Sequence, residues 1–212
     1  MALTGLFLIS FLVVHCAINA MIFYNDGGAT FTHWGHFMGT NPIIRTLEIG
    51  LVAGFIIHIF QGFAVWRQNR SARPVKYSKV KHPEKSKWYS RSMGLLGTLV
   101  LLFLIVHIAQ FWVPSRFGEL PEVRVQNGDM VHDLFSKMKA VFSYSWVVIL
   151  YVLGCISLGY HLAHGFQSAF RTLGVHNRKY VHMLVVLGNW FAVLITIAFI
   201  SMPVSMYFGI VK

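Results

Sequence analysis

Residues 160–165 have the sequence Tyr160-His161-Leu162-Ala163-His164-Gly165 and lie inside the apolar run Tyr144–Phe170. An ionisable ring at this depth in a segment of hydrocarbon length is energetically unfavourable and usually functional. The same His-x-x-x-Gly spacing occurs at His58 and Gly62 in an earlier apolar run. Two further runs contain His15 and His107. Any interpretation of the chain has to explain four histidines at membrane depth, one on each of four segments.

The composition is that of a membrane protein. Of the 212 residues, 56% are hydrophobic and only 12% are charged, and the mean hydropathy is +0.59. The apolar residues form runs long enough to cross a bilayer core, which takes about 20 residues of helix. The sequence therefore predicts an all-α, polytopic membrane protein whose single domain, residues 1–212, is a bundle of five transmembrane helices. We expect these helices at residues 3–24, 42–67, 92–113, 144–170 and 183–211.

Basic residues set the expected orientation. Nine of the eighteen Lys and Arg residues lie between Arg67 and Arg91, in one connecting loop. By the positive-inside rule, this loop and the shorter basic loop Arg171–Lys179 face the cytoplasm, so the N-terminus lies in the cytoplasm and the C-terminus outside. The basic loop suits an acidic partner domain or anionic lipid headgroups equally well. Its confinement to one connection argues against a nucleic-acid-binding protein.

The two connections on the outer side are expected to be loops. Asn25-Asp26-Gly27-Gly28 is a loop signal that starts the connection running to Thr40. The third helix is expected to stop before Pro114, and the mixed-charge segment Ser115–Ser143 is expected to be a second loop.

The helical rise of 1.5 Å per residue sorts the four histidines into two layers. His15 lies nine residues before Tyr24, roughly 14 Å below the outer end of its helix, and His107 lies roughly 10 Å below the outer end of the third helix. His58 and His161 each lie seventeen residues past the outer start of their helix, roughly 25 Å from the outer surface. One pair is therefore expected near the outside and the other nearer the cytoplasm, about 10–15 Å apart.

Two imidazoles at one depth on facing helices suit a b-type haem, whose iron they bind from opposite sides. The flat macrocycle also needs room beside the helix. Gly62 and Gly165 provide it because each lies four residues after a histidine, on the same helical face. Covalent c-type attachment is excluded because there is no Cys-x-x-Cys-His motif. The sequence thus predicts two b haems with four axial iron ligands, His15, His58, His107 and His161.

Three other polar residues are candidates for contacts with these cofactors. His164 is turned about 60° around the helix from His161, so one iron cannot easily use both rings. His164 is expected either to bond a haem propionate or a quinone, or to be structural. Arg67 and Arg171 end two helices on the cytoplasmic side. There they are expected either to reach the propionates of the inner haem or to be ordinary interfacial arginines.

A candidate quinone site lies at the outer start of the second helix. Arg45 and Glu48 are three residues apart there and are expected to pair. If a quinone docks near the outer haem, Glu48 is the nearest carboxyl group on a helix for handling protons. No residue is assigned a catalytic role of its own.

Taken together, these residues resemble the di-haem cytochrome b membrane anchor of succinate:quinone oxidoreductases (succinate dehydrogenase and fumarate reductase), in its single-chain, five-helix type. The resemblance covers essentially the whole chain. The motifs that carry it are His15-x-x-x-Asn19, Leu47-Glu48, His58-x-x-x-Gly62, and Tyr160-His161-x-x-x-Gly165 running on to Phe170 and Leu173-Gly174.

The resemblance implies that His15 and His107 hold the outer haem and that His58 and His161, rather than His164, hold the inner one. It implies partner subunits on the cytoplasmic side, a flavoprotein that oxidises succinate and an iron–sulfur protein. Electrons would pass from them through the two haems to a quinone, expected to be menaquinone. The expected location is the bacterial cytoplasmic membrane, in the respiratory chain and the tricarboxylic acid cycle. A higher oligomer of the complex is compatible with this assignment.

Two other interpretations remain open from the sequence. The five-helix di-haem subunit of another respiratory complex, such as a nitrate reductase or hydrogenase, also places paired histidines on facing helices. A haem-free transporter or proton channel would use the histidines as a relay. The near absence of acidic residues within the helices, apart from Glu48, argues against ion coupling.

Overall fold

Five long helices form the molecule. The computed structural model describes residues 1–72, 92–118, 120–125, 128 and 130–211, so most of the predicted basic loop Arg67–Arg91 lies outside the described residues. The long helices are α1 (Ala2–Ala20, extended by the 3-10 turn η1, Met21–Tyr24), α3 (Pro42–Ser71), α5 (Met93–His107), α8 (Ser145–Thr172) and α9 (Arg178–Tyr207). All five spans are long and apolar enough to cross a membrane. The expected all-α, five-helix architecture is therefore confirmed.

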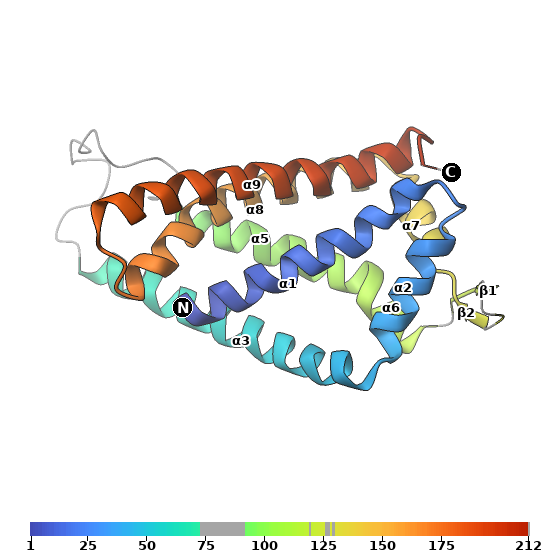
Figure 1. The fold of residues 1–212 in the computed structure, drawn as a ribbon, viewed down its shortest axis with the longest axis horizontal. Helices are drawn as coiled ribbons and strands as arrows, with labels where there is room; N and C mark the ends of the chain where they lie inside the picture. The colour runs from blue at the N-terminus through green and yellow to red at the C-terminus, as the bar shows by residue number, and fades with distance from the viewer. Residues whose placement is uncertain (73–91, 119, 126–127, 129, 212) are drawn as a thin grey trace.

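The two ends of the bundle differ. The N-terminus lies at one end, where α3 finishes and α5 begins, and the C-terminus lies at the other (Figure 1). The short elements of the described residues lie at the C-terminal end, which we call the capped end. These elements are α2 (Ala29–Thr40), α6 (Val113–Phe117), the antiparallel hairpin of β1 (Glu122–Arg124) and β2 (Met130–His132), and α7 (Leu134–Phe142).

Local sequence explains where two of the long helices begin. The Asn41 side chain accepts hydrogen bonds from the backbone amides of Ile43 and Ile44, and Pro42 occupies the first turn of α3, where its missing N–H is not needed. The Asn177 side chain accepts a bond from the Lys179 amide. This cap starts α9 five residues before the predicted residue 183, and the helix ends at Tyr207 rather than at residue 211. The second and fourth helices agree with the prediction to within a few residues, except that α3 continues to Ser71 rather than 67.

The two connections predicted as loops contain folded elements, which corrects the sequence interpretation. The turn at Asn25–Gly28 is present, but α2 follows it directly, and the Asp26 carboxylate accepts a bond from the Thr30 amide at the start of this helix. In the second connection, Asp133 caps α7 by accepting from the Ser136 amide. Each of these short helices follows an aspartate whose side chain accepts a hydrogen bond from a backbone amide in the first turn. The sequence analysis did not recognise these caps because polar and glycine residues, which are typical of loops, surround them.

Pro114 does not end the third helix, contrary to the prediction. A π-helical turn, η3 (Ile108–Trp112), follows α5, and the Val113 amide donates to the Ile108 carbonyl five residues back. In a regular α-helix the proline ring would clash with the carbonyl of Gln110, four residues earlier. The wider turn ends the regular helix first, so Pro114 falls in the first turn of α6, which continues to Phe117.

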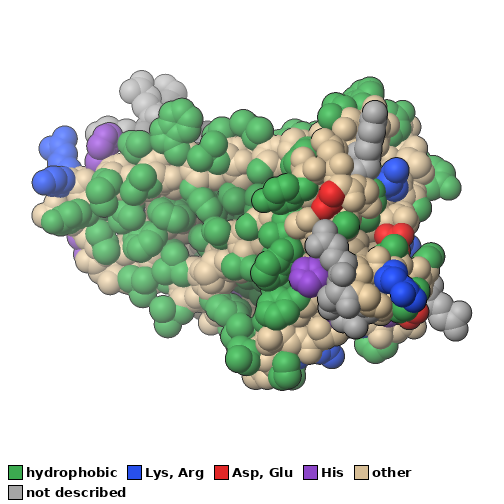
Figure 2. Space-filling model, turned by 45° about the vertical axis from the view of Figure 1, so that its right-hand side comes forward, with side chains coloured by type: hydrophobic (Ala, Val, Ile, Leu, Met, Phe, Trp, Pro, Cys, Tyr) green, Lys and Arg blue, Asp and Glu red, His purple; other side chains and the backbone are tan. Residues whose placement is uncertain are grey.

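Close packing is concentrated at the capped end and around α8. The buried core there joins η1, α2, α7, α8 and α9 through residues that include Ile22, Phe31, Phe135, Phe142 and Met206. By contrast, only 6% of the most apolar window of α1, α3 or α5 is buried, compared with 33% for α8. Apolar side chains cover the middle of the surface, and charged ones lie toward its two ends (Figure 2). This distribution matches a multi-pass membrane protein whose middle faces lipid.

Substitutions at two adjacent glycines can test how the short elements of the capped end pack together. Gly28 has a φ of +79°, and a Cβ atom at this position would overlap the ring of the buried Phe135. Gly27 has a φ of +70°, but nothing lies within 4 Å of its Cβ position. We expect Gly27→Ala to lower the free energy of unfolding by roughly 1–2 kcal/mol through backbone strain alone. Gly28→Ala should lower it by roughly 1–3 kcal/mol more through overpacking.

The measurement is thermal unfolding of both variants in the same detergent. Equal unfolding midpoints for Gly27→Ala and Gly28→Ala would contradict the packing of α7 against this turn.

Candidate functional site

The structure brings the predicted outer histidines together. His15 of α1 and His107, the last residue of α5, have ring centroids 5.8 Å apart and ring planes 87° apart. Phe11 stacks on His15 at 5.3 Å, and Tyr151 of α8 lies 5.9 Å from the His107 ring. An aromatic shell therefore surrounds this pair.

The predicted inner histidines also meet. His58 of α3 and His161 of α8 have ring centroids 6.2 Å apart, with an angle of 64° between their planes. Gly5 of α1 and Gly97 of α5 approach the two rings. Their Cβ positions would lie 3.7 Å from Cε1 of His58 and 3.6 Å from Cε1 of His161.

The two levels share one spacing rule that the sequence analysis missed. Gly5 lies ten residues before His15 on α1, and Gly97 lies ten residues before His107 on α5. Each of these helices thus supplies a histidine to the outer pair and a side-chain-free wall to the inner pair. Ten residues of helix place the two levels about 15 Å apart, in agreement with the depth estimate. The sequence did contain a signal for this arrangement, namely a glycine ten residues before each of the two outer histidines.

The polar atoms of the rings are only partly satisfied. Nδ1 of His107 and Nδ1 of His161 are buried and have no hydrogen-bond partner among the described residues. The Thr4 hydroxyl lies 3.3 Å from Nδ1 of His58, and also 3.0 Å from the Met1 carbonyl oxygen and 3.5 Å from Oε1 of Gln61. A hydrogen bond at Nδ1 orients the ring and leaves Nε2 as the nitrogen that can face a metal.

His15, the other histidine of the outer pair, has a hydrogen-bonding partner on its own helix. The amide nitrogen of Asn19 lies 2.8 Å from the His15 carbonyl oxygen and 3.4 Å from its Nδ1. Asn19 is one helical turn past His15, so it fixes the ring from the same face of α1.

Both pairs fit a bis-imidazole haem. Imidazole nitrogens bind a metal at about 2 Å, so two rings on either side of one iron have centroids roughly 6 Å apart. The described residues contain no group of three or more His, Cys, Asp or Glu that could hold a bare metal ion. Pairs of this kind suit a metal that brings its own equatorial ligands, as a porphyrin does.

The predicted glycines lie beside open space. Apart from chain neighbours and the backbone of the same helix, no atom of the described residues is within 4 Å of the Cβ position of Gly165, and at Gly62 only the Met1 methyl carbon is, at 3.6 Å. Both glycines are half-buried, as are the four histidines. Side chains of the described residues therefore leave space beside both glycines.

The other residues predicted to contact the cofactors, without binding iron, lie on α3 and α8. Arg67 and Arg171 are exposed near the ends of α3 and α8, and neither has a hydrogen bond or ion pair to another described residue. His164 is half-buried, and its Nε2 lies 3.1 Å from the Ser168 hydroxyl, one turn along α8. Direct ligation by His164 is not indicated.

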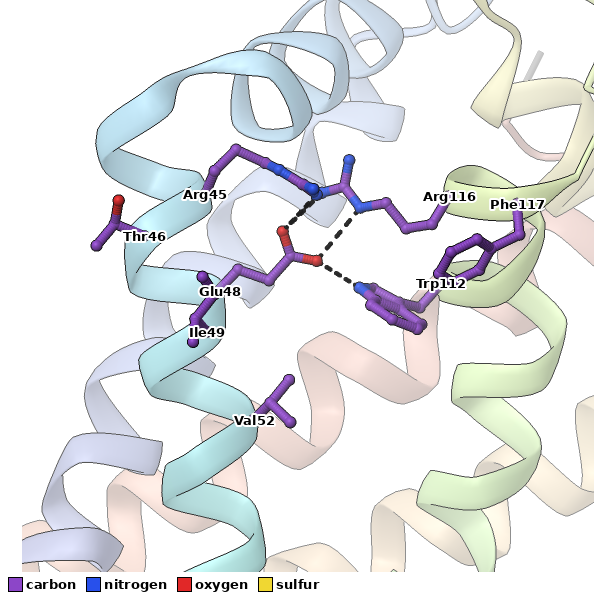
Figure 3. A pocket seen from close by; sticks show the side chains of 8 residues that line it. All are labelled: Arg45, Thr46, Glu48, Ile49, Val52, Trp112, Arg116 and Phe117. Carbon is purple, nitrogen blue, oxygen red and sulfur yellow. Dashed lines mark hydrogen bonds and ion pairs between the residues drawn. The ribbon is translucent and has the colours of Figure 1, made fainter.

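A second polar cluster lies at the capped end, around Glu48. Its carboxylate accepts from Arg45 at 2.8 Å, as predicted, and also from the indole N–H of Trp112 and from Arg116 at 3.0 and 3.2 Å (Figure 3). All four contacts are donors, a set that suits the ionised carboxyl group, which only accepts. We call these four residues the Glu48 cluster; the sequence analysis missed Trp112 and Arg116 because they are distant along the chain.

The Glu48 cluster forms the polar wall of a cavity of about 420 Å³ between α3 and the η3–α6 segment. Ile49 and Val52 continue the wall along α3, and Val52 lies about one turn further from the capped end than Glu48 (Figure 3). Phe117 lines the opposite side. The cavity is thus polar at one end and apolar at the other, which suits a ligand with a polar ring and an apolar tail.

No known family, curated protein or solved structure matches this chain. What the histidine pairs and the Glu48 cluster can do follows from their own geometry and chemistry.

The Glu48 cluster should stabilise the fold. Glu48→Gln removes the charge that two arginines share, in a side chain that is only 18% exposed. We expect it to lower the free energy of unfolding by roughly 1–3 kcal/mol, measured by thermal unfolding in detergent. Glu122→Gln, at an exposed position on β1, is the matched control and should change it by less than about 0.5 kcal/mol. Equal effects of the two changes would show that the cluster contributes nothing to stability.

Proposed function

We propose that this chain is the membrane-anchor cytochrome b subunit of a succinate:quinone oxidoreductase. In this role it relays electrons from an iron–sulfur partner through two b haems to a quinone. The observation that supports the proposal is the meeting of four membrane-depth histidines in two pairs, 5.8 and 6.2 Å apart, on four different helices. A hydrogen-bonding role for each ring alone does not account for two buried Nδ1 atoms that have no partner among the described residues.

The chain's part in electron transfer is to hold and insulate the cofactors. A bound haem supplies a one-electron couple at each pair. The helices fix the paired rings, the half-buried glycines leave room for the macrocycle edges, and Thr4 orients His58. Aromatic side chains such as Phe103 and Tyr151 exclude water from the outer pair. Arg67 and Arg171 are free to approach propionates at the other end of the bundle.

The cavity at the Glu48 cluster is the proposed quinone site. Quinone reduction takes up two protons as well as two electrons, so it needs a group that can transfer protons beside the ring. The Glu48 oxygens lie on the cavity wall, with Arg45 alongside. His107 and Trp112 are five residues apart on one continuous helix, roughly 7 Å along its axis. The cavity therefore lies nearer the outer pair than the inner pair, on the side of the capped end. We propose menaquinone as its substrate.

The remaining parts of the proposal follow from charge and topology. The basic segment between α3 and α5 would face the cytoplasm and bind the iron–sulfur and flavoprotein subunits, which carry the succinate chemistry. The capped end would then lie outside the bacterial cytoplasmic membrane. An electron moving outward would run down an inside-negative potential, a gain of about 2.3 kcal/mol per 100 mV.

Haem content tests the proposal directly. We expect the purified chain to hold two haems, measured by the pyridine haemochrome assay together with a dithionite-minus-oxidised spectrum. His107→Ala should remove the outer haem and His58→Ala the inner one, leaving one haem per chain in each case.

The control is His132→Ala, at an exposed position on β2, which should retain both haems. A wild-type chain without haem refutes the proposal. Reduction of the haems by succinate in the co-purified complex separates this assignment from other di-haem respiratory subunits.

The angles between the ring planes give a second prediction. Nearly perpendicular axial imidazoles give a strongly anisotropic low-spin EPR signal, and the anisotropy falls as the planes approach parallel. We expect the haem lost in His107→Ala to have the more anisotropic signal, since its ligand planes are 87° apart rather than 64°. The reverse assignment would contradict the ring orientations described above.

A further inference from the structure

Arg116 joins three elements of the capped end. Its Nε and Nη2 donate to the two oxygens of Glu48 on α3, at 3.2 and 3.0 Å. Its Nη1 donates to the Gly39 carbonyl at 3.0 Å, near the end of α2. Only a planar guanidinium can make this bidentate contact and still reach a third acceptor.

The π-helical turn explains how Arg116 reaches Glu48. In a regular helix, Trp112 and Arg116 would point about 140° and 180° away from His107. A π turn acts as a one-residue insertion, which turns everything after it back by about 100°. Both side chains then lie within roughly 80° of the His107 direction. One helix can thus present a histidine to α1 and two donors to α3.

Arg45 also bonds to Glu48, but its contacts differ from those of Arg116. It makes one bond to Glu48, from three residues earlier on the same helix, and its side chain is 48% exposed. The Arg116 side chain is 22% exposed, and its bonds cross between helices. Arg45 can therefore balance the charge of Glu48, while Arg116 also fixes where the carboxylate lies relative to the helix of His107.

We infer that Arg116 is the positioning residue of the quinone site, holding the Glu48 carboxylate in the cavity wall, where it can take up protons from the aqueous side of the capped end and pass them to the quinone that the haems reduce. This inference rests on the proposed function. Three N–H groups of Arg116 bind Glu48 and the Gly39 carbonyl, so the contacts it makes act on the position of Glu48. Its loss should slow the reaction at saturating quinone more than it weakens binding.

The test is the reoxidation of the dithionite-reduced full chain by menadione, followed by stopped-flow absorbance at the haem bands. For Arg116→Gln we expect the maximum rate to fall about tenfold and the half-saturating menadione concentration to rise less than about threefold. Arg116→Lys should restore only part of the rate, because an ammonium group cannot make the bidentate contact. Arg124→Gln removes an exposed arginine from β1 at the same end and should behave as wild type.

A double substitution shows whether Arg116 acts through Glu48. If it does, Glu48→Gln/Arg116→Gln should be no slower than Glu48→Gln alone. The double variant also leaves no carboxylate unpaired, so it guards against misfolding of the single variant. Haem content is measured for every variant and should remain at the wild-type value.

The outcomes distinguish a failure of the proposed function from a failure of the positioning role of Arg116. A wild-type chain that lacks haem, or whose reduced haems menadione does not oxidise, refutes the proposed function. A wild-type chain that reacts, with an Arg116→Gln variant of unchanged maximum rate, refutes the positioning role alone. Full recovery by Arg116→Lys, or rate losses that multiply in the double variant, would also refute it.

Discussion

The meeting of imidazole rings inside an apolar bundle is the constraint on which the rest of the structure depends. Hydrocarbon offers no water to a polar ring, so each histidine at membrane depth needs a partner from the protein or from a cofactor. The helices place the rings two by two, and His58 has Thr4 as a second partner, whereas Nδ1 of His107 and of His161 has none among the described residues. The sparse burial of α1, α3 and α5 fits helices whose apolar surfaces face lipid.

The capped end contains a second polar site, the Glu48 cluster. There the chain must hold a charged carboxylate close to lipid, and it does so by surrounding Glu48 with four donors from α3 and the η3–α6 segment. Three of these donors, from Trp112 and Arg116, come from the helical segment that continues from His107. The proposed redox level and the proposed proton-handling group are therefore parts of one rigid element, and the compact core of α2, α7 and α8 supports both.

The sequence predicted the five long helices and the histidine pairs because both depend on simple regularities. Apolar runs of about 20 residues indicate membrane-spanning helices. The rise of 1.5 Å per residue then gives the depth of each histidine from its position in the helix. The capped end was not predictable in this way. Its short helices α2 and α7 depend on single aspartate caps, and Pro114 misled the prediction because a π turn, which has no clear sequence signature, accommodates it. Trp112 and Arg116 meet Glu48 only as a result of that turn.

The offset of ten residues between Gly5 and His15, and between Gly97 and His107, has a mechanical consequence. Each of α1 and α5 is a continuous helix with a histidine of the outer pair at one point and the glycine beside the inner pair at a second. Sliding or tilting either helix displaces both points together. Strain introduced at one level, for instance by a partner pressing on the bundle, is therefore transmitted to the other without any change in the connecting loops.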